Sequence, residues 1–457
     1  MRLGVLNCLV ALSVAFLFLT IGQAFAQTPR LQGQGSAASG QANAFAAQAD
    51  DPSAVHYNPA GMTQLPGVQT MFGTLLIGGT TSFTSPTGAT TTGDRSASVA
   101  WPPPNHLYIT ANMGDLGVAA LRNVTVGIAA ISPFGSLTRY PNDNPFRTAV
   151  TFATLPLLDI KPTVAYRLND GLSVGLGADI YTFSGLFGEG HVEQRFVWPG
   201  GAGIPAGSQM ELNGSDTAVG FNVSLLYTPY RNDEGKPLVN IGLVYRSQAT
   251  LHLNGEFRAN GALVADAGAT LVLPQVLSGA VAVWPVRTRS REWKLEADVD
   301  YVGWESNRNL DVHLSNGATL PQPQNWRGSY TVMIGTEYRW LNLDSMPSWD
   351  VALRAGYQNQ QTQVPDRTFN PGVPSANTHI PSVGIGLLCR KDGSLLGVAR
   401  CGDVGVGRMK PQALGLDLSY QIAFYEDRTI TGNQNPTVNG TYKTAIHAGG
   451  ISVHFSY

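Results

Sequence analysis

The most constraining feature of this sequence is an alternation of apolar and polar residues that recurs from residue 68 to the last residue. The final segment shows it clearly, with apolar Ile451, Val453, Phe455 and Tyr457 alternating with Gly450, Ser452, His454 and Ser456. A period of two puts successive side chains on opposite faces of a β-strand. The pattern therefore predicts an all-β protein whose strands each carry one apolar face.

Composition indicates which kind of β-protein this is. Charged residues make up 13% of the chain, 52 residues are Gly and 9% are aromatic. Soluble domains carry roughly 25% charged residues. After residue 26, no stretch reaches the roughly 18 consecutive apolar residues that a membrane helix needs. A transmembrane antiparallel β-barrel satisfies both observations, because each strand shows lipid only its apolar face.

The spacing of the alternating segments predicts about fourteen strands, between residues 67 and 457. Short turns are expected at 169–171, 285–291 and 342–347. Long connections are expected at 187–216, 253–274, 304–327, 360–377 and 426–441. Short periplasmic turns and long outer loops are typical of outer-membrane barrels. The connection 389–410 departs from this rule, since it is long and falls on the periplasmic side.

The first 26 residues have the pattern of a cleaved secretory signal peptide. Arg2 gives a positive start, residues 9–21 form an uncharged apolar run, and Ala24-Phe25-Ala26 is a small-x-small cleavage site. A membrane anchor is the alternative, but the apolar run is too short and polar, Gly-rich sequence follows it. We therefore expect residues 1–26 to direct export to the bacterial outer membrane.

Residues 27–66 do not alternate and are rich in Gly, Ala and Gln. The alanine run that begins at Ala42 predicts a short helix ending near Asp50. A disordered tail is the alternative interpretation, but the segment lacks the charge that disorder usually carries. We expect an N-terminal hatch that plugs the lumen of the barrel formed by residues 67–457.

Two cysteines remain after removal of the signal peptide, Cys389 and Cys401, because Cys8 lies within it. An even pair in an oxidising compartment predicts a disulfide. A metal site would need neighbouring His or carboxylate ligands, and only Asp403 is close in sequence. We expect no metal and no cofactor.

A compact turn precedes the first strand, at Asn58-Pro59-Ala60-Gly61. Pro59 fixes its own backbone, Asn58 can bond to the local backbone, and Gly61 permits a tight reversal. The surrounding stretch, 51–62, resembles the hatch of the long-chain fatty acid transport (FadL) family of outer-membrane proteins. Further residues and stretches that resemble this family are 132–135, Tyr140, 161–162, 166–170, 242–247, 273–274, Trp304, 325–327 and 353–357.

The resemblance implies passive transport of a hydrophobic ligand through a fourteen-stranded barrel. The ligand would be caught outside, pass to an inner site beside the hatch, and leave sideways where the third strand is kinked. Asn58, Pro59, Ala60 and Gly61 would then form the gate against that kink. Gly127 and Pro133 are the candidate weak points of the third strand, since Pro cannot donate to a ladder and Gly packs poorly. The alternative is that both merely bend or end the strand.

Alternation also predicts which side chains face the lumen. Lys161, Arg246 and Arg354 point inward, so any of them could hold a ligand carboxylate in an apolar cavity. The alternative is that they neutralise inward carboxylates, namely Glu296, Asp298, Asp300 and Glu337. Tyr181 and Phe183 also point inward and could line an acyl or aryl pocket.

Three functions remain open. Uptake of long-chain fatty acids is our first hypothesis, uptake of aromatic or aliphatic hydrocarbons is the second, and a general porin or structural barrel is the third. Residues 171–175 match the G-x-S-x-G pattern of hydrolases, but Ser173 begins a strand and not the strand-to-helix elbow that this chemistry needs. We expect no enzyme and no nucleic-acid partner, and a monomer surrounded by membrane lipid.

Overall fold

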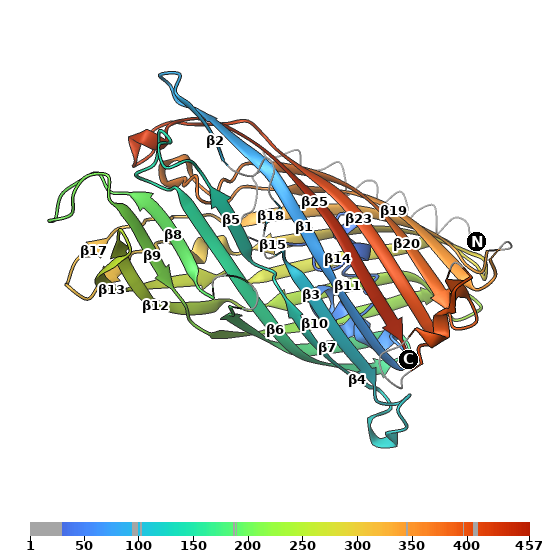
Figure 1. Ribbon diagram of the computed structural model, residues 1–457. Helices are drawn as coiled ribbons and strands as arrows, with labels where there is room; N and C mark the ends of the chain where they lie inside the picture. Colours follow the sequence, from blue (N-terminus) through green and yellow to red (C-terminus); the bar gives the residue numbers. More distant parts are fainter. Residues whose placement is uncertain are drawn as a thin grey trace.

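The computed structural model describes residues 30–93, 99–100, 103–185, 188, 190–343, 346–395, 397–404 and 410–457. The predicted signal peptide, residues 1–26, and the first three residues of the predicted hatch, 27–29, lie outside these ranges. The described chain forms a long barrel whose strands slant across its axis (Figure 1). No helix within these ranges is long and apolar enough to cross a membrane.

Fourteen antiparallel strands form the wall within the described residues, which confirms the predicted count. The barrel closes where β1 (Val68–Thr84) pairs with β25 (Gly440–Ser456), from Gln69↔Ser456 to Thr84↔Thr441. The other wall strands are β3 (Asn105–Asn112), β4 (Val124–Ile131), β6 (Phe152–Asn169), β7 (Leu172–Phe183), β10 (Ala218–Arg231), β11 (Pro237–Arg246), β14 (Val276–Arg287), β15 (Arg291–Val302), β18 (Ser329–Trp340), β19 (Trp349–Gln360), β20 (Thr378–Arg390) and β23 (Ala413–Tyr425).

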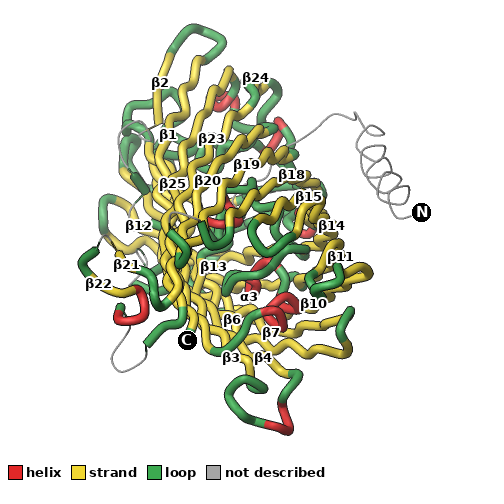
Figure 2. The backbone as a smooth tube through the Cα atoms, turned by 90° about the vertical axis from the view of Figure 1, so that its right-hand side faces the viewer, coloured by secondary structure: helices red, strands yellow, loops and turns green. Residues whose placement is uncertain are grey.

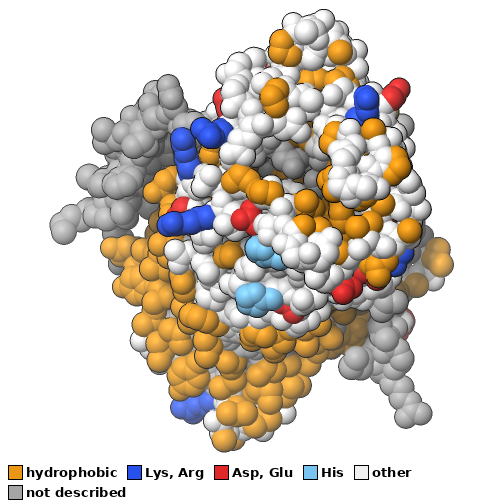
Figure 3. Space-filling model, turned by 90° about the vertical axis from the view of Figure 1, so that its left-hand side faces the viewer, with side chains coloured by type: hydrophobic (Ala, Val, Ile, Leu, Met, Phe, Trp, Pro, Cys, Tyr) orange, Lys and Arg blue, Asp and Glu red, His pale blue; other side chains and the backbone are white. Residues whose placement is uncertain are grey.

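The wall strands put apolar side chains outward and smaller or polar ones inward. On β10, Phe221 and Val223 are exposed, whereas the intervening Asn222 and Ser224 are buried. Hydrocarbon can solvate the first pair but not the second. Figure 3 shows the resulting apolar belt on one face of the barrel, next to a surface of mixed polar side chains.

Beyond the wall, the long connections form further strands, which corrects part of the prediction. The segments 187–216 and 253–274, expected as loops, contain β8 (Val192–Val197), β9 (Gln209–Gly214), β12 (Ala249–Ala259) and β13 (Ala262–Leu273). The turn between β12 and β13 is Asn260-Gly261, with positive φ at both residues, a strong hairpin signal. These strands pair into a sheet that extends the wall outward (Figure 1).

Several shorter elements complete the connections. The remaining outer strands are β2 (Thr90–Gly93), β5 (Gly135–Arg139), β16 (Val312–Leu314), β17 (Thr319–Leu320) and β24 (Arg428–Ile430). The 3-10 turns outside the N-terminal segment are η2 (Ala119–Leu121), η3 (Trp304–Ser306), η4 (Asp366–Thr368), η5 (Cys401–Asp403) and η6 (Pro436–Val438).

Residues 30–66, which we call the N-terminal segment, lie inside the barrel. They form α2 (Ser36–Ser39), α3 (Ala54–Tyr57) and η1 (Pro59–Gln64), and Figure 2 shows α3 within the ring of strands. The helix expected in the alanine run is absent from this described segment, because Ala42, Asn43 and Ala49 all have positive φ.

The connection after β20 is tied together by its two cysteines. Cys389 and Cys401 form a disulfide with their Cα atoms 6.0 Å apart, and both side chains are buried. Between them, β21 (Ser394–Leu395) and β22 (Ala399–Arg400) make a small hairpin. The bond therefore crosslinks a long connection at the end of the barrel where most turns are short.

Candidate functional site

The N-terminal segment is held in the lumen by carboxylates on β15. Asp298 Oδ2 accepts hydrogen bonds from the backbone N–H groups of Phe45 and Ala46, both at 3.0 Å. Glu296 Oε1 accepts from the N–H groups of Ala47 at 2.7 Å and Gln48 at 3.2 Å. These donors face the wall and not a helix axis, which explains why the alanine run is not helical. Two of the three inward carboxylates predicted on this strand therefore bind backbone N–H groups of the segment.

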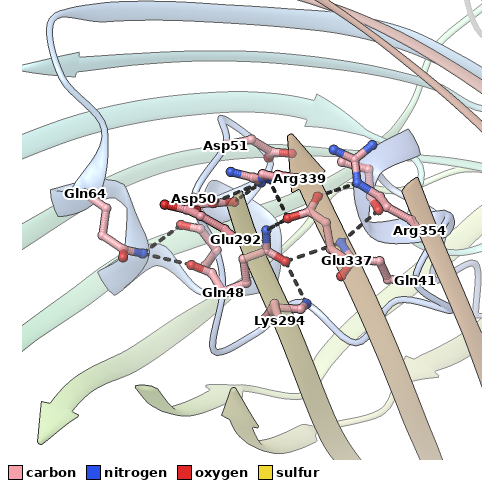
Figure 4. Close-up of polar contacts among 12 residues, drawn as sticks. Gln41, Gln48, Asp50, Asp51, Gln64, Glu292, Lys294, Glu337, Arg339 and Arg354 are labelled. Atoms are coloured by element: carbon pink, nitrogen blue, oxygen red, sulfur yellow. Dashed lines mark hydrogen bonds and ion pairs between the residues drawn. The ribbon is translucent and has the colours of Figure 1, made fainter. Parts of the chain in front are cut away.

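Lys294 completes this anchor from the same strand. Its Nζ lies 2.7 Å from Glu296 Oε2 and 2.7 Å from Gln48 Oε1, and its side chain is 1% exposed. Figure 4 shows Lys294 and Gln48 beside a second group of charges. Hydrogen bonds to ionised groups in a buried setting are stronger than neutral ones.

The second group of charges surrounds Glu337. Its Oε2 lies 2.6 Å from Arg354 Nε, its Oε1 lies 2.6 Å from Arg339 Nε, and Arg339 also pairs with Asp50 at 3.1 Å (Figure 4). Arg354 Nη1 reaches Asp417 at 2.5 Å. Arg354, a predicted ligand contact, thus has two carboxylate partners, as the alternative interpretation proposed.

Lys161, on the opposite side of the barrel, also has two carboxylate partners. Its Nζ is 3.2 Å from Asp159 Oδ2 and also pairs with Asp179, and all three side chains are buried. Asp179 belongs to the neighbouring strand β7 and also accepts a bond from Asn222 at 2.9 Å. Because two carboxylates neutralise the charge of Lys161, it has little attraction for the carboxylate of a ligand.

Arg246 is different, since no carboxylate in the described chain forms an ion pair with it. Its Nη2 donates to the carbonyl oxygen of His56, and its Nε has no partner among the described residues. It lines a small cavity of about 20 Å³ with Arg30 and His56. Nδ1 of His56 and Oδ1 of Asp298 also lack partners in this part of the chain. A cavity of this size holds about one water molecule or the tip of a polar group.

The predicted turn at 58–61 packs against the inner face of the barrel wall. Asn58 Oδ1 accepts from Ala60 N–H at 3.1 Å, as the turn chemistry predicts. Asn58 Nδ2 donates to Ala46 O and to Leu225 O on β10. A Cβ at Gly175 on β7 would lie 2.6 Å from Ala60 N, so glycine is needed where the segment touches the wall.

The expected contact of this turn with the third strand is met at Gly127 but not at Pro133. The η1 helix that starts at Pro59 contacts β6, β7 and β10 most and β4 less, and its Met62 lies against Gly127. Pro133 instead faces residues 31–34.

The third wall strand is broken at Pro133. β4 ends at Ile131 and β5 begins at Gly135, and β5 pairs with β6 alone among the described strands. The N-terminal segment fills the break, because Leu31 N–H donates to Pro133 O at 2.8 Å and Gln34 Nε2 donates to Ser132 O at 2.9 Å. An isolated bridge joins Arg30 to Phe134.

Gly127 does not weaken this strand, which corrects the second predicted weak point. Its register with Thr110 on β3 and Thr163 on β6 is unbroken. A Cβ at this position would lie 2.7 Å from the sulfur of Met62 and 2.9 Å from Val55. Glycine is used here for close approach of the N-terminal segment.

Above the segment, the lumen is packed by an apolar group that includes Phe134, Tyr181, Trp304 and Trp326, which we call the aromatic cluster. Ring centroids are 6.0 Å apart for Phe134 and Tyr181, 6.2 Å for Phe134 and Trp304, and 5.2 Å for Trp304 and Trp326. Phe183 packs against the same group. The indole N–H groups of Trp304 and Trp326 lack partners in the described chain.

The apolar group that contains the aromatic cluster extends from the strand position beside Arg246 toward the outer surface. Arg246 pairs across the ladder with Val276, a member of the same apolar group. At the other end, Trp326 also packs against the cluster that contains Phe369 and Val438. Those two residues line an outer cavity of about 330 Å³. Apolar side chains thus run from an outer cavity to Arg246 and to the broken strand.

Sequence reasoning missed Arg30 and Phe134, although it placed Tyr181, Phe183 and Arg246 inward. Arg30 pairs with Asp300 at 2.7 Å and lies between the cavity and the break. No periodic pattern surrounds Arg30, so its position had no local signal. Phe134 directly follows Pro133, and the interruption of the alternation at that proline was a usable signal.

Comparisons with known proteins are consistent with this architecture. A family model described as outer membrane protein transport protein (OMPP1/FadL/TodX) matches residues 17–410. The long-chain fatty acid transport protein of Escherichia coli K12 is 25% identical over 428 residues, covering 84% of this chain and 87% of that protein. The protein of the same name from Salmonella typhi is 25% identical over 411 residues, covering 84% of this chain and 86% of that protein.

Solved structures share the fold. A Pseudomonas aeruginosa FadL homologue superposes with a TM-score of 0.70 at 17% identity, covering 95% of this chain and all of that one. The toluene transporter TbuX of Ralstonia pickettii superposes with a TM-score of 0.60 at 15% identity, covering 93% of this chain and 99% of that one.

Proposed function

The chain belongs to the FadL/TodX family of outer-membrane transport proteins, and we propose that its cargo is a long-chain fatty acid taken up by passive diffusion. As a member of this family it is a β-barrel of the bacterial outer membrane that transports hydrophobic compounds. Its relatives are transporters and not enzymes. What remains to be argued is the chemistry of the cargo and its route.

Arg246 is the observation that carries the fatty-acid proposal. Of the three cations predicted to face inward, it alone has no carboxylate partner in the described chain, and its Nε is free to donate. It lies at the inner end of the aromatic cluster, through its pairing with Val276. A carboxylate head at Arg246 with an alkyl tail among the aromatic rings would satisfy both the free donor and the apolar surface.

Hydrocarbon uptake is the second candidate, and the aromatic cluster itself favours it. Four aromatic side chains on the route offer stacking to an aryl ligand without any charged contact. The TbuX structure, whose protein transports toluene, shares the fold at 15% identity. The two candidates differ in one respect, since only the acid needs Arg246.

Uptake of two labelled cargoes tests this difference. The full chain is expressed in a bacterium that lacks its own fatty-acid transporter, and uptake of labelled oleate and labelled toluene is measured. We expect Arg246→Gln to lower oleate uptake about 10- to 100-fold, since a charge-assisted bond contributes about 1.5–3 kcal/mol, and to leave toluene uptake unchanged.

The exposed Arg258→Gln serves as the matched control and should change neither cargo. Toluene uptake without oleate uptake by the wild type would refute the fatty-acid proposal in favour of the hydrocarbon. Equal uptake of polar sugars would favour a general porin instead.

For the route, we propose that residues 30–66 act as a hatch and that cargo leaves sideways at the break around Pro133. The hydrogen bonds from Leu31 and Gln34 to residues at the break support this proposal. They let the N-terminal segment cover the gap in the wall without adding a strand to it. The turn at 58–61 would then hold the base of the hatch, away from the opening.

Pro59→Ala tests the role of that turn. We expect lower uptake with an unchanged amount of folded barrel, because a more flexible turn no longer fixes the hatch on β7 and β10. The amount of folded barrel is read from its heat-modifiable migration on gels. Unchanged uptake at equal abundance would leave the turn with a structural role only.

A further inference from the structure

The turn between β3 and β4, residues 113–123, carries a row of exposed apolar side chains. Leu116 is 51% exposed, Val118 37% and Leu121 41%. Ala119 and Ala120 between them are also exposed. Exposing this apolar surface to water is unfavourable, and a contiguous exposed apolar patch usually marks a contact surface.

Hydrogen bonds fix the base of the turn, whereas its apolar side chains are largely exposed. Asn112 Oδ1 accepts from Gly114 N–H at 3.0 Å, and Asp115 Oδ2 accepts from Gly67 N–H at 2.8 Å. A Cβ at Gly114 would lie 2.6 Å from Arg122 O, so the two arms meet closely at the base. Polar bonds therefore fix the base of the turn and leave its apolar tip free.

The turn projects sideways from the barrel and not along its axis. Figure 2 shows the loop that joins β3 and β4, with its short red helix, standing outside the ring of strands, and Figure 1 shows it below β4. Ala119–Leu121, the helix within it, contains no buried residue. The apolar tip thus points to the space that lipid occupies around a membrane barrel.

The tip continues the lipid-facing belt of the neighbouring strands. Val126 and Ile128 on β4 and Tyr166 and Leu168 on β6 are all exposed on the outer face. Other short turns at this end are polar, as the turn Asn169-Asp170-Gly171 and the turn at 232–236 show. In the β3–β4 turn, three large apolar residues extend the belt, whereas Met346 is the one exposed large apolar residue described in the turn between β18 and β19.

We propose that the β3–β4 turn inserts Leu116, Val118 and Leu121 into the periplasmic leaflet of the outer membrane. Burial of these side chains removes apolar surface from water. Arg122 has a long stem that lets its charge reach the headgroups. The turn joins the second and third wall strands, so this insertion would fix the wall beside the break in lipid.

Single-cysteine probes test the proposal in the full chain. Because Cys389 and Cys401 are bonded to each other, Leu116→Cys or Val118→Cys adds a free thiol for an environment-sensitive fluorophore. The labelled protein is placed in phosphatidylethanolamine–phosphatidylglycerol vesicles that carry a nitroxide on the upper acyl chain. Ile128→Cys, on the lipid-facing wall, is the positive control, and Asp233→Cys, on a polar turn, is the negative control.

We expect the probes at 116 and 118 to be quenched by the lipid nitroxide within about twofold of the probe at 128, and the probe at 233 to be quenched mainly by aqueous iodide. Iodide quenching at 116 and 118 equal to that at 233 would overturn the proposal. Blue-shifted emission that depends on protein density, without nitroxide quenching, would assign the tip to a second copy of the chain and would also overturn it. Heat-modifiable migration confirms that each variant is folded.

Discussion

The two halves of the lumen are filled by different chemistry. In the inner half, the N-terminal segment is bound by buried charges such as Asp298 and Glu296, which accept from four backbone N–H groups. In the outer half, side chains such as Leu251 and Trp304 pack with almost no polar contact. Directional bonds fix one arrangement, whereas apolar packing can re-form around a hydrophobic guest.

This difference indicates how a plugged barrel can still let an apolar molecule pass. The outer half offers a route of uniform apolar character from the surface inward. In the proposed route, the inner half resists such a molecule, which would then leave at the broken strand. Arg246 lies at the boundary, and three predictions test whether the two halves behave independently.

The largest effect is expected when the inner anchors are removed. Glu296→Gln combined with Asp298→Asn leaves Lys294 buried without a charged partner, which costs about 3–5 kcal/mol. We expect hydrogen exchange of the amides at 45–48 to rise strongly, as read by mass spectrometry. Glu234→Gln, which removes an exposed pair with Arg289, should leave that exchange unchanged. Unchanged exchange in the double variant would mean that the segment is held by packing instead.

A smaller effect is expected in the outer half. Leu251 is fully buried, and Leu251→Ala should lower the free energy of unfolding by about 2–5 kcal/mol through a cavity. We expect the exchange of the amides at 45–48 to stay at the wild-type rate. A parallel rise in that exchange would show that the two halves are coupled and would break the comparison.

The smallest effect concerns pH. Burial raises the pKa of Asp51, in the N-terminal segment, from 3.8 to about 6. A raised carboxyl pKa favours the protonated form in the fold, so its stabilisation is present below the lower value and is lost as the pH rises through about 6. Because the side chain is partly exposed, we expect a loss of about 1 kcal/mol. Urea midpoints of wild type and Asp51→Asn between about pH 4 and pH 8 measure it; equal pH dependence would contradict the assignment.

Much of the wall follows from the sequence because strand formation and side-chain facing are local. The period-two pattern predicts that Lys161 and Arg354 point into the lumen, whatever position their strands take in the barrel. It does not reveal that Asp417 will lie beside Arg354, because the two residues are 63 positions apart. Asp179 is 18 positions from Lys161, across the β6–β7 turn, but their pairing depends on the register of that hairpin. The outer hairpin β12–β13 was missed, although Asn260-Gly261 signals it, because the surrounding segment was interpreted as a loop.

The candidate site was predictable only where a local rule applies. Pro133 cannot donate to a ladder, so a break at that residue follows from its chemistry. Gly127 was interpreted by the same rule and is instead a point of close approach to Met62. The contact of Asn58 with β10, away from the break, could not be foreseen, because no local rule states which wall strands a plug will touch.

The sequence by itself determined a charge-poor barrel of fourteen strands, the inward side chains, and a pair of cysteines free to bond. Only the tertiary structure decided which inward charges are neutralised and which is left. Ion pairing depends on distances between strands and on the path of the N-terminal segment, whereas facing depends on each strand alone. That is why the sequence could not distinguish the three inward cations, whereas in the described structure Arg246 is the one of the three that has a buried donor without a partner.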